Sequence, residues 1–303
     1  MQKISLVVVL AILTFFIIQN KKNPHLLLNQ PLDRILHPTD TRLRYRIADI
    51  DPRFNISQEK AIQLSQEAAK IWKDGTGKEF FLYDPKAKLT INFHYDHRQA
   101  ESTARSSSEK NIEANQAQWM NKKQEVETFR KDIDRYNSLL NAKKIEYDNQ
   151  VQYYNDQIAQ VNQNGGANST QRETFAQQKQ YLANQMDVLK FEIDGYNQKI
   201  DVLNRQVNEL NQMNQNINLS IQHFNHRFKP YLFDKGNFDG QNINIFEFQS
   251  HDDLRLTLAH EFGHALGLKH HEDSRGLMHP MMQDQDQQNF RLMPSDIALL
   301  SQR

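Results

Sequence analysis

Two histidines and a glutamate lie close together in the stretch His260-Glu261-Phe262-Gly263-His264. On a helix, side chains four residues apart point the same way, so His260 and His264 are expected to share one metal ion. Glu261 lies one step around the helix, near the open coordination position, where a carboxylate can take a proton from metal-activated water. The spacing therefore predicts a zinc-dependent hydrolase.

The residues after this helix supply a third ligand. Gly267 lets the chain leave the helix with a positive φ, and His270 can then swing back toward the metal. Three neutral imidazoles leave a fourth position for water, as in a catalytic zinc site, and zinc lowers the pKa of that water to about 7. The alternative is a buried helix with incidental histidines, which the combined spacing of His260, His264, Gly267 and His270 disfavours.

Short strands and helices on either side must position this helix. Alternating apolar residues predict strands at 43–47 and 89–95, and an apolar helical pattern predicts a helix at 57–72. A further strand is expected at 242–248, directly before the histidine helix. Residues 42–98 are too few to bury a core alone, so we expect them to fold with residues 227–303 as one α+β domain.

The segment between these two halves has a different pattern, because apolar residues recur at every seventh position in two runs. Two such runs predict a long antiparallel coiled-coil hairpin at 99–226, inserted into the domain, with its turn at about 162–170. The alternative is a disordered low-complexity region. The first run is Ile112, Trp119, Val126, Ile133, Leu140, Tyr147, Tyr154 and Val161, and the second is Phe175, Leu182, Leu189, Tyr196, Leu203, Leu210, Ile217 and Phe224.

The N-terminal residues 1–22 contain an apolar run at 4–18, with only Ser5 and Thr14 polar. Its length lies between that of a signal peptide and that of a full membrane span. We expect an uncleaved transmembrane anchor; a cleaved export signal and a cytosolic apolar tail are the alternatives. Residues 23–41 are polar and contain proline, so they are expected to form a linker.

Composition excludes several functions. The 303 residues carry 37 basic and 37 acidic side chains, so zero net charge argues against broad binding of nucleic acid. There is no cysteine, which excludes disulfides, cysteine nucleophiles and zinc ribbons. The mean hydropathy of -0.79 is low for a compact enzyme and fits long polar helices.

The pattern from His260 to His270 resembles that of the metzincin zinc endopeptidases, and Gly276-Leu277-Met278-His279-Pro280 resembles their Met-turn. The short spacing between them is most similar to the matrixin branch, the matrix metalloproteinase type. The resemblance covers residues 42–98 and 227–303. It implies a zincin-like fold with one catalytic Zn²⁺ held by His260, His264 and His270, with Glu261 as general base and Met278 as the apolar floor.

The chain departs from that family in three ways. Without cysteine, a cysteine switch is impossible. The predicted hairpin lies where matrixins carry their middle strands and structural metal sites, so the edge strand that would bind substrate cannot be identified. His279 stands where related enzymes often show tyrosine.

Other residues are weaker candidates. His94, Asp96 and His97 are either part of a second metal site or, as we favour, a polar strand end. His271 is an alternative to its neighbour as ligand. Met281 and Met282 are expected to form pocket wall or core.

The sequence thus predicts a membrane-tethered zinc endopeptidase that cleaves protein or peptide substrates outside the cytoplasm, or a secreted one. The hairpin would bind substrate, a coiled-coil partner or a second copy of the chain. The alternative is an adhesion or scaffold protein whose zinc peptidase-like domain is latent or inactive. Glu261 favours the enzyme, because a binding protein has no physical need for a carboxylate at that position.

Overall fold

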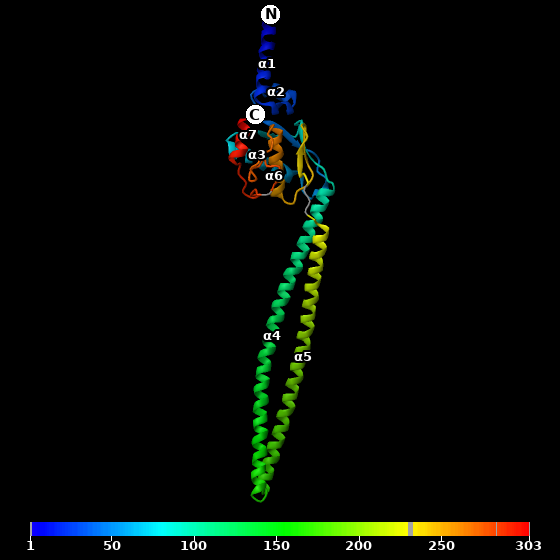
Figure 1. The fold of residues 1–303 in the computed structure, drawn as a ribbon, viewed down its shortest axis with the longest axis vertical. Helices are drawn as coiled ribbons and strands as arrows, with labels where there is room; N and C mark the ends of the chain where they lie inside the picture. Colours follow the sequence, from blue (N-terminus) through cyan, green and yellow to red (C-terminus); the bar gives the residue numbers. More distant parts are fainter. Residues whose placement is uncertain (1, 230–232, 283, 303) are drawn as a thin grey trace. The chain divides into compact units, whose positions relative to one another are not determined.

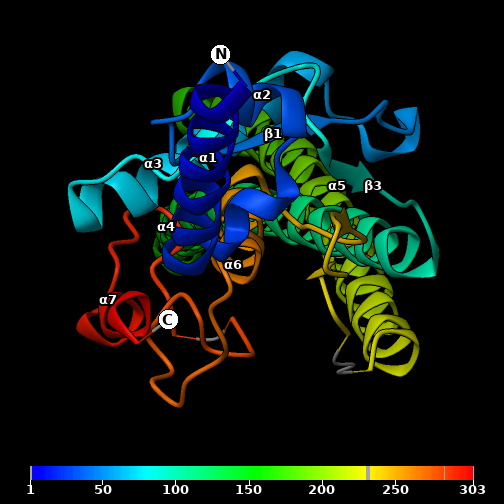
Figure 2. The same cartoon turned by 90° about the horizontal axis from the view of Figure 1, so that it is seen from above.

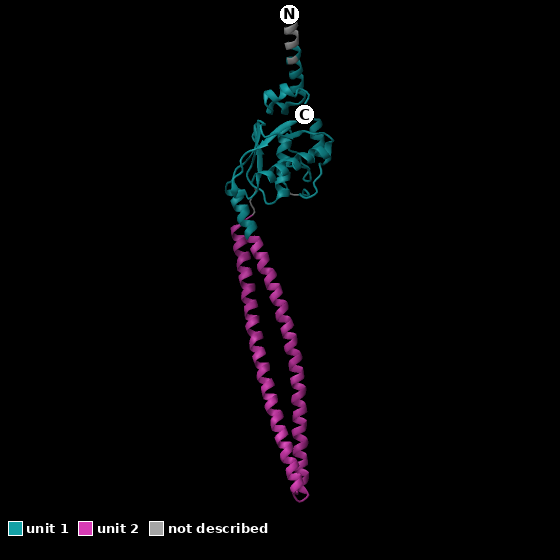
Figure 3. Ribbon diagram, turned by 180° about the vertical axis from the view of Figure 1, so that it is seen from behind, with its two compact units in different colours: residues 1–107, 230–303 teal, residues 108–229 magenta. Residues whose placement is uncertain are grey.

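The computed structural model describes residues 2–229, 233–282 and 284–302, and the side chains of residues 2–9 and 12 are outside this description. The chain divides into two compact units (Figure 3). The first contains residues 1–107 and 230–303, and the second contains residues 108–229.

A five-stranded sheet forms one layer of the first unit, with two helices beside it (Figure 1). The strand order is β2-β1-β3-β5-β4. Strands β2, β1, β3 and β5 are parallel to one another, and β4 runs antiparallel to β5 at one edge. The expected strand at 242–248 is shorter, because the chain leaves the sheet after Ile245. The bounds are β1 Leu43–Ile47, β2 Phe81–Tyr83, β3 Leu89–Phe93, β4 Gly236–Phe238 and β5 Asn242–Ile245.

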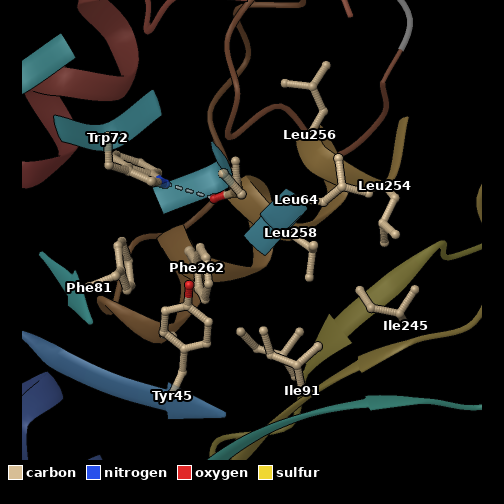
Figure 4. Close-up of a cluster of buried hydrophobic side chains, with 14 of the residues drawn as sticks. Tyr45, Leu64, Trp72, Phe81, Ile91, Ile245, Leu254, Leu256, Leu258 and Phe262 are labelled. Carbon is tan, nitrogen blue, oxygen red and sulfur yellow. Dashed lines mark hydrogen bonds between the residues drawn. The ribbon is translucent and has the colours of Figure 1, made fainter. Parts of the chain in front are cut away.

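Two helices, α3 Gln58–Thr76 and α6 His251–Ala265, pack against each other and against one face of this sheet (Figure 4). Each begins at a serine whose side chain accepts a backbone N–H of the first turn, Ser57 for α3 and Ser250 for α6. Gly77, at φ 72°, ends α3 in the left-handed conformation. A short helix, α7 Pro294–Ser301, closes the chain.

Trp72 is the largest fully buried side chain of this core, and its Nε1–H donates to the carbonyl oxygen of Ala259 on α6 at 2.9 Å (Figure 4). It joins α3 directly to the helix of the histidines. Trp72→Ala is expected to lower the free energy of unfolding by about 3–5 kcal/mol, because it removes this bond and leaves a large cavity. Urea unfolding monitored by circular dichroism measures the change. Lys70→Ala, at an exposed position of α3, is the control, and equal midpoints for the two variants would contradict the prediction.

The N-terminal residues form three helices, α1 Gln2–Lys22, the 3₁₀ helix η1 Pro24–Leu28 and α2 Pro31–Leu36. Residues 23–41, expected as a linker, therefore hold two short helices, and α2 lies beside α1 (Figure 2). Within the described part of the chain, no helix combines the length and the apolar character needed to cross a membrane. The expected anchor at 4–18 falls partly on side chains outside that part, and it is not confirmed.

Two long helices, α4 His97–Gln163 and α5 Ser169–Arg227, form the second unit, except that residues 97–107 of α4 belong to the first. They are antiparallel: Trp119 donates to the carbonyl of Leu210, and the ring of Tyr154 lies edge-on to that of Phe175. Gly165 and Gly166 turn the chain at positive φ, and Asn168 caps α5. Apart from Phe228, the buried apolar residues described in the unit lie at the seventh-residue positions of the two runs, namely Val126, Ile133, Leu140, Leu182, Leu189, Leu203 and Ile217.

Candidate metal centre

Helix α6 brings His260 and His264 together. The residues are one turn apart, and their Nε2 atoms are separated by 3.1 Å. The inward face of the helix is apolar, with Leu254, Leu258 and Phe262 fully buried, so packing fixes which way the histidines point. The helix forms and packs as expected, and the four-residue spacing of His260 and His264 therefore brings their side chains to one site.

His270 reaches the same point after a sharp turn. The helix ends at Ala265, and Gly267 adopts φ 92°, a conformation that a side chain would resist. The Nε2 of His270 then lies 3.2 Å from that of His260 and 3.1 Å from that of His264. The structure thus places the three predicted histidines around one point.

The three nitrogens fit a zinc ion. His260 Nδ1 donates to the carbonyl of Leu277 at 2.6 Å, and His264 Nδ1 donates to that of Leu268 at 2.9 Å, so their Nε2 atoms carry the free lone pairs. Nitrogens bound tetrahedrally to zinc at about 2.0–2.1 Å lie about 3.3 Å apart, close to the separations seen here. Within the described residues, these three histidines form the one group of this kind able to hold a metal ion.

Burial sets the charge state of the site. It lowers the pKa of His260 to about 4, which keeps the imidazole neutral and its lone pair available. Burial likewise raises the pKa of Glu261 to about 8, while the backbone of Phe238 acts in the opposite direction. A cation held by the histidines would lower this pKa again and favour the ionised carboxylate. Glu261 Oε2 is buried without a hydrogen-bond partner. A cation or a metal-activated water beside the three imidazoles would supply the interaction partner that this carboxylate oxygen lacks.

Residues 276–280, which resemble a Met-turn, pack against helix α6. Met278 is fully buried, and a Cβ added to Gly263 of α6 would collide with its Sδ, so the glycine is needed for this close approach. The buried carboxylate of Asp296 holds the turn by accepting the backbone N–H groups of Leu277 and Met278 at 3.0 and 2.9 Å. It also contacts His271 Nε2 at 2.8 Å. The sequence did not identify this role of Asp296.

A cleft of about 860 Å³ opens over the histidines and Glu261. Its lining includes strand β4 and the segment His279, Pro280, Met281 and Met282. Sequence reasoning missed β4, because three residues, Gly236-Asn237-Phe238, show no alternation. The one local signal is Asp239-Gly240, whose aspartate accepts the N–H of Asn242 and turns the chain into β5.

The weaker candidates are placed elsewhere. His94 Nε2 contacts the side chain of Asn244 at 3.0 Å, and Asp96 pairs with Arg98 at 2.6 Å, so they do not form a second metal group within the described chain. His271 faces Asp296 and not the other histidines. Met281 and Met282 line the cleft.

Comparison with known proteins agrees with this geometry. The family model of the matrixins, peptidase family M10, matches residues 37–302. A matrilysin from Felis catus is 47% identical over 59 residues, which is 20% of this chain and 20% of that protein. The match therefore spans one fifth of the curated relative's length. Since the family model covers most of the sequence, the chain belongs to the matrixins, a family of zinc-dependent metalloendopeptidases.

Proposed function

We propose that this chain is an active zinc-dependent endopeptidase in which His260, His264 and His270 hold the metal and Glu261 is the general base. The observation that carries this proposal is the convergence of the three Nε2 atoms at 3.1–3.2 Å. Glu261, whose Oε2 has no hydrogen-bond partner, lines the same cleft. Membership of the matrixin family supports it.

Bound zinc would polarise the scissile carbonyl and lower the pKa of the attacking water. Glu261 accepts the proton of that water and then delivers it to the leaving amine, which makes one residue both base and acid. Glu261 is buried in the wall of the cleft, where little water reaches it. Opposite charges interact more strongly in such a low dielectric, and this favours both proton transfers. The hydrogen bonds from His260 and His264 to backbone carbonyls keep both rings in the orientation that binding needs.

The edge of the sheet favours an extended peptide as the substrate. Strand β4 pairs with β5 on one side, and its other side is not paired with any strand of the described chain. Gly236, Asn237 and Phe238 also line the cleft. An extended chain can therefore add to β4 through main-chain hydrogen bonds, with its scissile bond over the histidines.

Removal of the metal tests the proposal. A strong chelator is expected to abolish cleavage of an unfolded protein substrate, and added zinc is expected to restore it. The assay compares untreated, chelated and zinc-restored enzyme. The adhesion or scaffold alternative predicts a different result, a chain that binds zinc and cleaves nothing in any of the three states.

We propose further that the two long helices form a coiled-coil arm that binds the protein substrate or a partner chain. Tyr181, Val188 and Phe191 of α5 are 53%, 54% and 79% exposed, outside the buried apolar positions of the unit. Large apolar side chains gathered on one exposed face are typical of interaction surfaces.

The double variant Val188→Asp, Phe191→Asp is expected to lower the rate of cleavage of a natural protein substrate, because it removes apolar contact area from the arm. Hydrolysis of a short peptide is expected to stay unchanged, because both residues are far in sequence from the histidines. The ratio of the two rates is the measurement. Lys190→Asp, an exposed position on the same turn, is the matched control. An unchanged ratio would show that this face does not bind substrate.

The N-terminal helix is proposed to tether the enzyme to a membrane with the catalytic unit outside the cytoplasm; a secreted enzyme is the alternative. Leu10, Leu13, Phe15, Ile17 and Ile18 of α1 are 45–56% exposed and lie on several sides of the helix. A surface helix of a soluble domain has one apolar stripe, so this distribution favours lipid contact.

A further inference from the structure

The short helices between α1 and the sheet present an unusually apolar surface. Leu27, Leu32, Ile35 and Leu36 are each 58–64% exposed. One exposed leucine is ordinary, but four within residues 27–36 make a continuous patch of the kind that marks an interaction site.

This segment is fastened to the catalytic unit. Leu26 is buried, and His25 Nε2 contacts the carbonyl oxygen of Thr41 at 3.0 Å. The side-chain amide of Asn29 pairs with the backbone at the start of β1, donating to the carbonyl of Arg42 at 2.9 Å and accepting from the N–H of Arg44 at 2.8 Å. The outward face of residues 24–36 is therefore held in a fixed position relative to the sheet.

The same segment is joined to the end of α1. Gln19 donates to the carbonyl of Pro38 at 2.7 Å, and the Arg34 guanidinium lies over the ring of Phe16 at 5.3 Å. A mostly apolar groove of about 940 Å³ runs between them. Its lining includes Leu13, Phe15, Leu27, Pro31 and Ile35.

Lipid fits this surface better than a protein partner does. The patch is continuous with α1, whose exposed apolar residues lie on several sides, whereas one docked protein would cover a single stripe. Lys21, Lys22 and Arg34 lie where the apolar run ends, and Asp33 is the one acidic residue between positions 2 and 36. Basic side chains at the end of an apolar run can bind anionic lipid headgroups, while the methylene groups of the lysine and arginine side chains lie along the apolar surface.

We propose that residues 24–36 form a lipid collar, which inserts into the headgroup and upper acyl region of the bilayer that α1 enters. The proposal rests on the membrane tether proposed above. With the collar inserted, the catalytic unit is held against the bilayer in one orientation, and it does not hang from a flexible linker.

The absence of cysteine allows a direct test, because one introduced thiol is the only labelling site. In the full-length chain, Ile35→Cys reports on the collar, Leu10→Cys reports on the tether, and His97→Cys, with its exposed side chain beyond β3, is the control. Each is labelled with a polarity-sensitive fluorophore and mixed with vesicles of phosphatidylcholine and phosphatidylglycerol. Nitroxide lipids, spin-labelled near the headgroup or deep in the acyl chain, then quench by depth.

The collar predicts a blue shift at Ile35 with quenching mainly by the shallow nitroxide, quenching at Leu10 mainly by the deep nitroxide, and neither effect at His97. If Leu10 is quenched while Ile35 remains in water like His97, the collar is wrong and the tether stands. If neither Leu10 nor Ile35 responds, the tether fails and the collar fails with it. Equal peptide hydrolysis by the labelled variants verifies that each is folded.

Discussion

Replacing Glu261 by glutamine is expected to lower the rate of peptide hydrolysis by about 10²–10⁴-fold and to leave bound zinc unchanged. The side chain is buried and lines the cleft beside the histidines, and glutamine has nearly the same shape. An amide cannot accept the proton of the attacking water, and it has none of suitable acidity for the leaving amine. The loss should appear in kcat, because the proton transfers belong to the chemical step and not to peptide binding.

Glu272→Gln is the matched control, since it makes the same chemical change at an exposed position two residues after His270. It should hydrolyse the peptide as the unmodified chain does. A Glu261→Gln enzyme that retained a rate within a few-fold of the unmodified chain would remove Glu261 from the role of general base, even with zinc bound.

Replacing Asp296 by alanine is expected to destabilise the catalytic unit by about 3–5 kcal/mol, the range seen when one partner of a buried polar pair is removed. Asp296 is fully buried, and its carboxylate accepts the backbone N–H groups of Leu277, Met278 and Met293 and contacts His271. Alanine leaves these donors in the interior without an acceptor, and each such group costs about 1–3 kcal/mol. Urea unfolding of the zinc-loaded enzyme measures the loss.

The same variant should bind zinc about 10–100-fold more weakly, because Asp296 fixes the Met-turn on which a ligand depends. The N–H of Leu277 is held by Asp296, and its carbonyl accepts the Nδ1–H of His260. Asp284→Ala, at an exposed position of the preceding loop, is the control. Equal unfolding midpoints and equal zinc affinity for the two variants would contradict this account of Asp296.

The sequence predicted the histidine helix well because its information is local. A spacing of four residues, an apolar inward face and a helix-ending glycine act within a few turns of one another, and the structure brings His260, His264 and His270 together as expected. The long helical region was predicted for the same reason, since a seventh-residue apolar repeat sustained over many turns is typical of paired long helices.

Features that depend on distant residues were missed. Strand β4 shows no sequence pattern of its own, and its position depends on pairing with β5. Lys235, directly before β4, also holds it in place, because its ammonium group lies 2.7 Å from the carboxylate of Asp253 on α6. Asp296 looked like an ordinary residue of a closing helix, because the turn that it holds lies 18 and 19 residues earlier in the chain. The helices η1 and α2 are short, and the contacts that fix them, such as Asn29 with the start of β1, are long-range.

His260, His264 and His270 together with Glu261 are proposed to form a working zinc peptidase site. The most direct test measures bound zinc and the rate of peptide hydrolysis in the same preparations of the unmodified chain and of Glu261→Gln. The expected result is about one zinc per chain in both, the number that three imidazole ligands around one point can hold, with hydrolysis in the unmodified chain alone. Zinc bound by both chains with hydrolysis by neither, or equal hydrolysis by both, would contradict it.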